Sequence, residues 1–239
     1  MKTEPYQYKV NNMQQTLHPF FSIIITTYNR AQLLKRALNS MLSQTEHDWE
    51  AIIIDDDSTD DTQRQVLPYI CSSTQIKYFR KPHRGEALSK NRGIFSSTGK
   101  FISFLDSDDE YEPSHLQSRK EILLRDPSIQ FLYGGTRIIG NQFVPDRFDN
   151  KKSIHLSECA IGGTFFIERS VLTQLGGFRN ILIGTDADLF DRIKEGGIVM
   201  KETNIDSYIY HHENEDSVTN MLIRSNSEKD GIYTDINHH

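Results

Sequence analysis

The chain has 239 residues, of which 36% are hydrophobic and 25% charged, and its formal net charge at pH 7 is −6. At roughly 150 residues per domain, this length allows one large domain whose core needs no metal or disulfide. The two cysteines exclude a disulfide framework and favour a cytoplasmic protein. The acidic balance excludes general nucleic-acid binding, and the lack of an apolar run of about 20 residues excludes a transmembrane segment.

The first half of the chain alternates between short apolar runs and helical patterns. Residues 1–19 are polar, so we expect a flexible or surface-laid arm before a single domain over residues 20–239. The apolar runs predict strands of a buried parallel sheet at residues 21–25, 51–54, 76–79 and 101–105. Apolar stripes between them predict helices at residues 33–42, 61–67, 85–97 and 113–127. This alternation predicts an α/β fold with a doubly wound, mostly parallel sheet flanked by helices.

The second half is less regular than the first. Its patterns predict strands at residues 131–139 and 164–168. They also predict two helices, each followed by a pair of glycines, at residues 170–175 and 186–195. Two caps are also expected in the first half. Asn29 with Gln32 resembles a capping box for the first helix, and Ser58 with Asp61 can cap the second.

Acidic residues gather after two of the predicted strands. The triplet at residues 55–57 follows the second strand, and Asp106, Asp108 and Asp109 follow the strand at 101–105. Both groups therefore lie at carboxyl ends of parallel strands, where open α/β sheets bind ligands. Crowded carboxylates repel one another unless a cation intervenes, and Mg²⁺ or Mn²⁺ suits carboxylate and phosphate oxygens. The alternative, solvated acids that cap helices, is favoured for Asp60 and Asp61.

A family resemblance covers residues 20–117. Five motifs occur there in order, at residues 22–29, 40–50, 54–60, 85–93 and 99–109. In this order and spacing they resemble the nucleotide-binding half of glycosyltransferase family 2, the inverting enzymes with the GT-A fold. A looser resemblance, at residues 176–189, lies in the acceptor-side half at 118–239. The resemblance implies a GT-A type sheet followed by a less regular acceptor-side half.

The resemblance also implies an activity. A hexosyl group would move from a nucleoside-diphosphate sugar, expected to be UDP-linked, to a hydroxyl of a glycan or lipid-linked glycan. Mn²⁺ or Mg²⁺ would assist the departing diphosphate, and an Asp would take the hydroxyl proton. Bacterial polysaccharide biosynthesis is the implied setting, in the cytoplasm and with peripheral contact at the inner face of the membrane.

On the donor side, the resemblance assigns roles to individual residues. Thr26, Tyr28 and Asp56 would contact the base and ribose. Asp106 would lie against the ribose and a metal-bound water, and Asp108 would bind the metal.

The remaining assignments each have an alternative. Lys90, where the family usually has Arg, would reach the base or phosphate; otherwise it is a solvated lysine on a helix surface. Asp186 would be the general base, although Thr185 stands where the family commonly has Glu, and helix capping is its alternative. Asp188 is interpreted as a solvated acid of the first turn, with a role in the acceptor site as its alternative. His212 would approach the metal or diphosphate, or else be a surface histidine.

Two other functions stay open. A catalytically degenerate module that binds nucleotide sugars is one, because Thr185 replaces an expected acid. A nucleotidyl or phosphoryl transferase is less favoured, because the turn at residues 26–29 has no glycine to cradle a phosphate.

Overall fold

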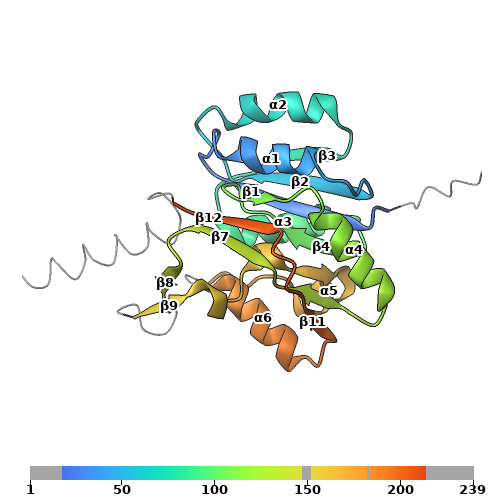
Figure 1. Ribbon diagram of the computed structural model, residues 1–239. Helices are drawn as coiled ribbons and strands as arrows, with labels where there is room; N and C mark the ends of the chain where they lie inside the picture. The colour runs from blue at the N-terminus through green and yellow to red at the C-terminus, as the bar shows by residue number, and fades with distance from the viewer. Residues whose placement is uncertain (1–17, 147–151, 182–183, 214–239) are drawn as a thin grey trace, which may run out of the picture.

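The computed structural model describes residues 18–146, 152–181 and 184–213. Its centre is a seven-stranded sheet with helices on both faces (Figure 1). In spatial order the strands are β11 (Met200–Glu202), β6 (Phe131–Tyr133), β10 (Phe166–Glu168), β4 (Phe101–Phe104), β1 (Phe21–Thr27), β2 (Trp49–Asp55) and β3 (Ile76–Arg80). The four strands β4-β1-β2-β3 are parallel, whereas β10 runs antiparallel to both of its neighbours. The mixed α/β architecture predicted from the sequence is confirmed.

Within the described ranges, six α-helices cover the sheet. They are α1 (Leu34–Leu42), α2 (Thr62–Ser72), α3 (Glu86–Ser96), α4 (His115–Arg125), α5 (Arg169–Leu175) and α6 (Thr185–Glu195). Side chains alternate across β1, so Ile23 and Ile25 pack with residues of α1, α2 and α4, while Ile24 packs with residues of α3, α5 and α6. Each face of the sheet therefore has its own apolar core.

Shorter elements complete the second half. A three-stranded sheet has the order β5 (Glu110–Tyr111), β12 (Tyr208–His212), β7 (Thr136–Gly140), and β8 (Phe143–Pro145) pairs with β9 (Ser153–His155). Two 3₁₀ turns span Leu156–Glu158 and Gly162–Thr164. None of the helices in the described ranges is long and apolar enough to cross a membrane.

The structure corrects the strand predicted at residues 131–139. This segment is divided into β6 and β7 by Gly134 and Gly135, whose φ angles are +91° and +78°. Both backbone conformations are in the region that favours glycine, which ends one strand and redirects the chain into the other sheet. Of the predicted arm at 1–19, residues 1–17 lie outside the described residues.

The two predicted caps are also wrong. Helix α1 starts at Leu34 without a side-chain cap, and Asn29 instead adopts a φ of +52° and accepts a hydrogen bond from Thr59 N (2.7 Å). Asn29 therefore links the loop after β1 to the loop after β2. At α2 the residue that accepts from the Thr62 N–H is Asp60 rather than Ser58 or Asp61 (3.0 Å).

Candidate active site

The carboxyl ends of β1, β2 and β4 meet at one edge of the sheet. Their register places Thr27 beside Asp55 and Ile24 beside Phe104, so the loops that follow are neighbours. These loops carry most of the donor-side residues predicted from the sequence, while half-buried Thr26 lies near the end of β1 itself.

One part of this edge combines an aromatic surface with a buried carboxylate. Asp56 accepts the backbone N–H groups of Arg84 (3.0 Å) and Gly85 (2.8 Å), and His83 Nδ1 lies 2.8 Å from Asp56 Oδ2. The His83 ring stacks on Tyr28 with a centroid distance of 4.3 Å. His83 therefore lies between Tyr28 and Asp56 and contacts both. The Tyr28 side chain stays 44% exposed. His83 is not among the site residues predicted from the sequence.

Lys90 is buried, which contradicts its interpretation as a solvated lysine. Its ammonium lies 2.7 Å from Glu86 Oε1 and 3.2 Å from Asp186 Oδ1. Burial alone would lower the pKa of Lys90, but the carboxylates of Asp186, Glu86 and Asp106 outweigh burial and raise it well above its usual range. Lys90 is therefore a permanent cation among three acids.

The acidic loop after β4 concentrates negative charge. Burial is the main cause that raises the pKa of Asp106 to about 7; Lys90 opposes it, and Glu86, Asp186 and Asp108 add to it. In the same loop, the Asp108 carboxylate pairs with Arg30 (Oδ2–Nη1 2.5 Å), and the Arg36 guanidinium donates to the Asp108 carbonyl. Two arginines thus neutralise this loop in the structure.

Asp109 holds the acidic loop to β12. Its Oδ2 accepts from the Tyr208 hydroxyl (2.5 Å), and its Oδ1 accepts the His211 N–H (2.7 Å). Burial, and then the charges of Asp106 and Asp108, raise the pKa of Asp109 well above its usual range. Since its oxygens face the protein interior, Asp109 has a structural role.

Asp186 reaches the donor side from the second half of the chain. It lies in the first turn of α6, with Oδ1 near Lys90 and Oδ2 accepting the Gly162 N–H (3.2 Å). A Cβ on Gly162 would overlap the Asp186 carboxylate, so the close approach requires glycine. The helix-capping alternative is not observed. Gly184, which has no side chain, occupies the N-cap position, and the Asp186 carboxylate contacts Lys90 and the Gly162 N–H.

The structure contradicts the sequence interpretation of Asp188 and leaves the proposed metal-binding role of His212 untested. Asp188 is not a free solvated acid: it pairs with Arg179 (3.2 Å) and Arg192 (2.8 Å). His212 is buried, with Nδ1 2.8 Å from the Asn141 carbonyl and Nε2 without a hydrogen-bond partner. No hydrogen bond joins its ring to the acidic loop in the part of the chain that the structure describes, so its metal-binding role stays a prediction.

The acidic loop is the candidate metal site. Among the described residues, no group of three or more His, Cys, Asp or Glu side chains is arranged to hold a metal ion on its own. The crowded carboxylates of Asp106 and Asp108, one of them satisfied by a guanidinium, do fit a divalent cation whose remaining ligands come from a diphosphate. Among the described residues, these two carboxylates would therefore need oxygens from a ligand to complete a metal site.

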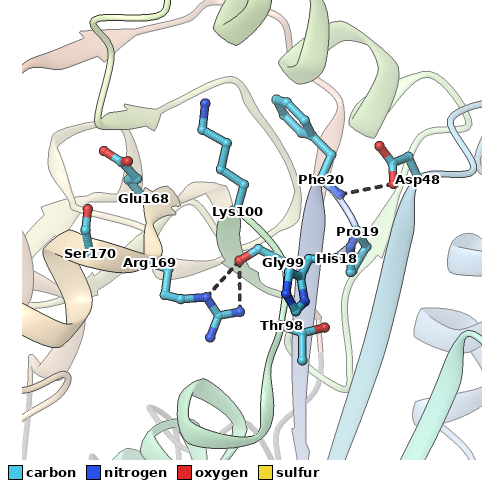
Figure 2. A pocket seen from close by; sticks show the side chains of 10 residues that line it. All are labelled: His18, Pro19, Phe20, Asp48, Thr98, Gly99, Lys100, Glu168, Arg169 and Ser170. Atoms are coloured by element: carbon cyan, nitrogen blue, oxygen red, sulfur yellow. Dashed lines mark hydrogen bonds between the residues drawn. The ribbon is translucent and has the colours of Figure 1, made fainter. Parts of the chain in front are cut away.

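A pocket of about 410 Å³ lies at the opposite edge of the sheet (Figure 2). It is formed where the chain enters β1 and β4, by residues that include Phe20, Lys100 and Arg169. The Arg169 guanidinium is directed to the carbonyl of Gly99 (Figure 2) and also bonds that of Ser97. The pocket contains none of the site residues predicted from the sequence, so it is separate from the candidate active site.

This architecture is that of the GT-A glycosyltransferases. The structure resembles that of S. aureus TarS 1–349 in complex with UDP-GlcNAc, with a TM-score of 0.71 at 18% identity over 83% of this chain and 60% of that one. It also resembles the mannosyltransferase PcManGT from Pyrobaculum calidifontis in complex with GDP-Man and Mn²⁺, with a TM-score of 0.63 at 19% identity over 81% and 57% of the two chains. These likenesses show the fold.

The sequence comparison identifies the family. Residues 22–176 match the family described as Glycosyl transferase family 2, and this chain belongs to it. One relative is the UDP-Glc:alpha-D-GlcNAc-diphosphoundecaprenol beta-1,3-glucosyltransferase WfgD of Escherichia coli, which is 33% identical over 157 residues. The match covers 63% of this chain and 61% of that relative, so the chain spans about three fifths of the relative's length.

Proposed function

We propose that this protein is an inverting glycosyltransferase that transfers a hexosyl group from a nucleoside-diphosphate sugar, UDP-linked, to an acceptor hydroxyl. The observation that carries the proposal is the ion pair between Asp186, from the acceptor-side half, and Lys90 of the donor-side half, whose charge also interacts with that of Asp106 in the acidic loop. This contact supports a proposal in which the base and the diphosphate site lie on opposite sides of the reacting carbon.

The reaction needs one proton acceptor and one leaving-group site. The acceptor oxygen attacks the anomeric carbon while the Asp186 carboxylate takes the hydroxyl proton, and the bond from that carbon to the diphosphate oxygen breaks. Attack opposite the leaving group inverts the anomeric configuration. The Asp186 side chain is 26% exposed, so a hydroxyl can approach it. A positioned general base typically contributes 10²–10⁴-fold.

The donor site is assigned to the carboxyl edge of the sheet. Tyr28 offers a face for the base, Asp56 an acceptor for a ring N–H, and Thr26 a contact near the ribose. Lys90 contributes positive charge towards the phosphates. A bound Mn²⁺ or Mg²⁺ supplies Lewis-acid stabilisation of the departing diphosphate. Asp108 would hold this ion with Asp106 beside it, and His212 is its third proposed neighbour.

The acceptor is proposed to be a glycan or lipid-linked glycan. The E. coli relative is named for a diphosphoundecaprenol-linked sugar as its acceptor and UDP-Glc as its donor. A lipid-linked acceptor would bring this chain to the inner face of the bacterial membrane from the cytoplasm, in polysaccharide biosynthesis.

Thermal unfolding with a panel of nucleoside diphosphates, each with and without Mn²⁺, tests the donor site. Ligand at 100 times its dissociation constant should stabilise the protein by roughly 2.7 kcal/mol. We expect a metal-dependent shift with UDP. Absence of a shift with every nucleotide contradicts the proposal.

Donor hydrolysis then separates an enzyme from a degenerate nucleotide-sugar-binding module. We expect slow hydrolysis of the UDP-sugar by the wild-type chain and its loss in Asp186→Asn, with UDP binding unchanged. Binding without hydrolysis or transfer to any glycan acceptor identifies the degenerate module instead.

A further inference from the structure

We propose that Glu86 is a positioning residue for the base, acting through Lys90 on Asp186. Glu86 and Lys90 are one turn apart on α3, and Lys90 joins them to α6. The inference rests on the proposed function, in which Asp186 accepts the proton. In this inference a second carboxylate, on a different helix, acts on the base through Lys90.

The Glu86 side chain is 43% exposed, but the Lys90 ammonium with which it pairs is buried. A Glu–Lys pair four residues apart on a helix is usually solvated and contributes little. Here the Lys90 side chain is 3% exposed, and its ammonium lies 5.8 Å from the ring centroid of Phe104 and 5.2 Å from that of Phe178. Because water cannot hydrate this cation freely, its position depends on the carboxylates that bind it.

The base is oriented from two sides. Lys90 contacts Oδ1 of Asp186, and the Gly162 N–H is donated to Oδ2. Since both oxygens are held, the carboxylate has one orientation and keeps its remaining lone pairs for an acceptor hydroxyl. Proton transfer depends on such geometry, because small misplacements of a reacting group slow the reaction strongly.

Helix α3 also fixes the chain segment before α6. Asn91, which follows Lys90, accepts the Phe178 N–H and donates to the Phe178 carbonyl, both at 2.8 Å. The Phe178 ring then lies over the Lys90 ammonium. Helix α3 therefore carries the Lys90 ammonium and, through Asn91, also positions the Phe178 ring that covers it.

Glu86 decides how the single positive charge is shared. Lys90 faces the carboxylates of Glu86, Asp186 and Asp106. With Glu86 uncharged, the ammonium is drawn towards the other two, so that it covers the proton-accepting carboxylate more tightly. The predicted consequence is a slower chemical step rather than weaker donor binding.

The test compares Glu86→Gln and Glu86→Asp with the wild-type protein. The matched control is Glu121→Gln, because Glu121 is an exposed acid on helix α4 whose side chain accepts a hydrogen bond from Gln117. We measure kcat and KM for UDP-sugar hydrolysis and transfer, and UDP affinity by calorimetry. For Glu86→Gln we expect kcat to fall on the order of tenfold, as for loss of a charged hydrogen bond, with KM and UDP affinity within twofold. Glu86→Asp, which keeps the charge, should recover part of the rate.

Three results overturn the inference: an unchanged kcat in Glu86→Gln, a fall in UDP affinity that matches the fall in kcat, or an equal loss in Glu121→Gln. Should Glu86→Gln fail to fold, Glu86→Asp still has to show a lower kcat at unchanged KM. An active wild-type chain with an unaffected Glu86→Gln contradicts this inference alone. A wild-type chain that binds UDP without turnover contradicts the proposed function as well.

Discussion

The Arg30 guanidinium and the Asp108 carboxylate form an ion pair in the acidic loop, with Nη1 2.5 Å from Oδ2. Both side chains are largely buried, at 14% and 15% exposure. A metal that binds Asp108 must therefore compete with a cation that the protein already supplies.

Removal of that competitor should favour the metal. We expect Arg30→Gln to bind Mn²⁺ more tightly than the wild type when both are saturated with UDP, by about tenfold, the scale of one charged hydrogen bond. Titration with Mn²⁺ followed by electron paramagnetic resonance measures this affinity. Lys35→Gln is the control, since the half-buried Lys35 donates to Gln32. Equal or weaker Mn²⁺ binding by Arg30→Gln would show that Asp108 is not a metal ligand.

Removal of the Asp108 charge should have the opposite effect. We expect Asp108→Asn to lose the Mn²⁺-dependent part of UDP binding, because an amide is a poor ligand for a hard cation, while UDP binding without metal changes little. Calorimetry with UDP, with and without Mn²⁺, gives both values. Asp57→Asn is the control: Asp57 also follows a strand, but its side chain is 51% exposed and pairs with Arg80. The same loss in both variants argues for a general charge effect.

The sequence predicted well those parts of the fold that depend on residues close together in the chain. The apolar runs of β1, β2 and β4 are continuous because these strands are buried on both faces, and the acids that follow them lie together because parallel strands share an edge. The division between β6 and β7 was missed, because its cause is the positive φ of Gly134 and Gly135 rather than any break in apolar period.

The surroundings of Lys90 depended on distant parts of the chain. Glu86 and Lys90 have the spacing of a solvated helical pair, and only the arrival of Phe178 and Asp186 from the second half buries the ammonium. Gly162 is a comparable case. The sequence contains a glycine pair there, but the reason for it, the Asp186 carboxylate in the space of a Cβ, exists only in the folded chain.

Glu50 should make stability depend on pH in the acid range. Burial would raise its pKa, but hydrogen bonds from Lys77, Ser22 and Thr98 prevail and lower the pKa of Glu50 to about 2. A lowered carboxyl pKa stabilises the fold above its unfolded value near 4.5, and this contribution disappears as the pH falls towards 2. At neutral pH the lowered pKa of Glu50 adds about 3 kcal/mol to the free energy of unfolding.

We therefore expect Glu50→Gln to unfold at lower urea concentration than the wild type at pH 7, with a difference that narrows between pH 5 and about 2. Urea unfolding across this range measures the free energy of unfolding. Glu121→Gln should follow the wild-type curve, because Glu121 is exposed. Parallel curves for Glu50→Gln and the wild type would mean that the Glu50 charge does not stabilise the fold.

Gly162→Ala tests the orientation of the base without changing its chemistry. The added methyl would occupy the position of the Asp186 carboxylate, whereas no positive φ at Gly162 would strain an alanine there. We expect kcat to fall by about 10²-fold, the scale for a misplaced reacting group, with KM for the donor little changed. Gly196→Ala at the other end of α6 is the control, since its φ is −74° and its nearest contact is a helix carbonyl. Both variants are assayed for transfer and for the midpoint of thermal unfolding. A similar loss of rate and stability in both would mean that α6 tolerates no change, whereas full activity of Gly162→Ala would remove Asp186 as the base.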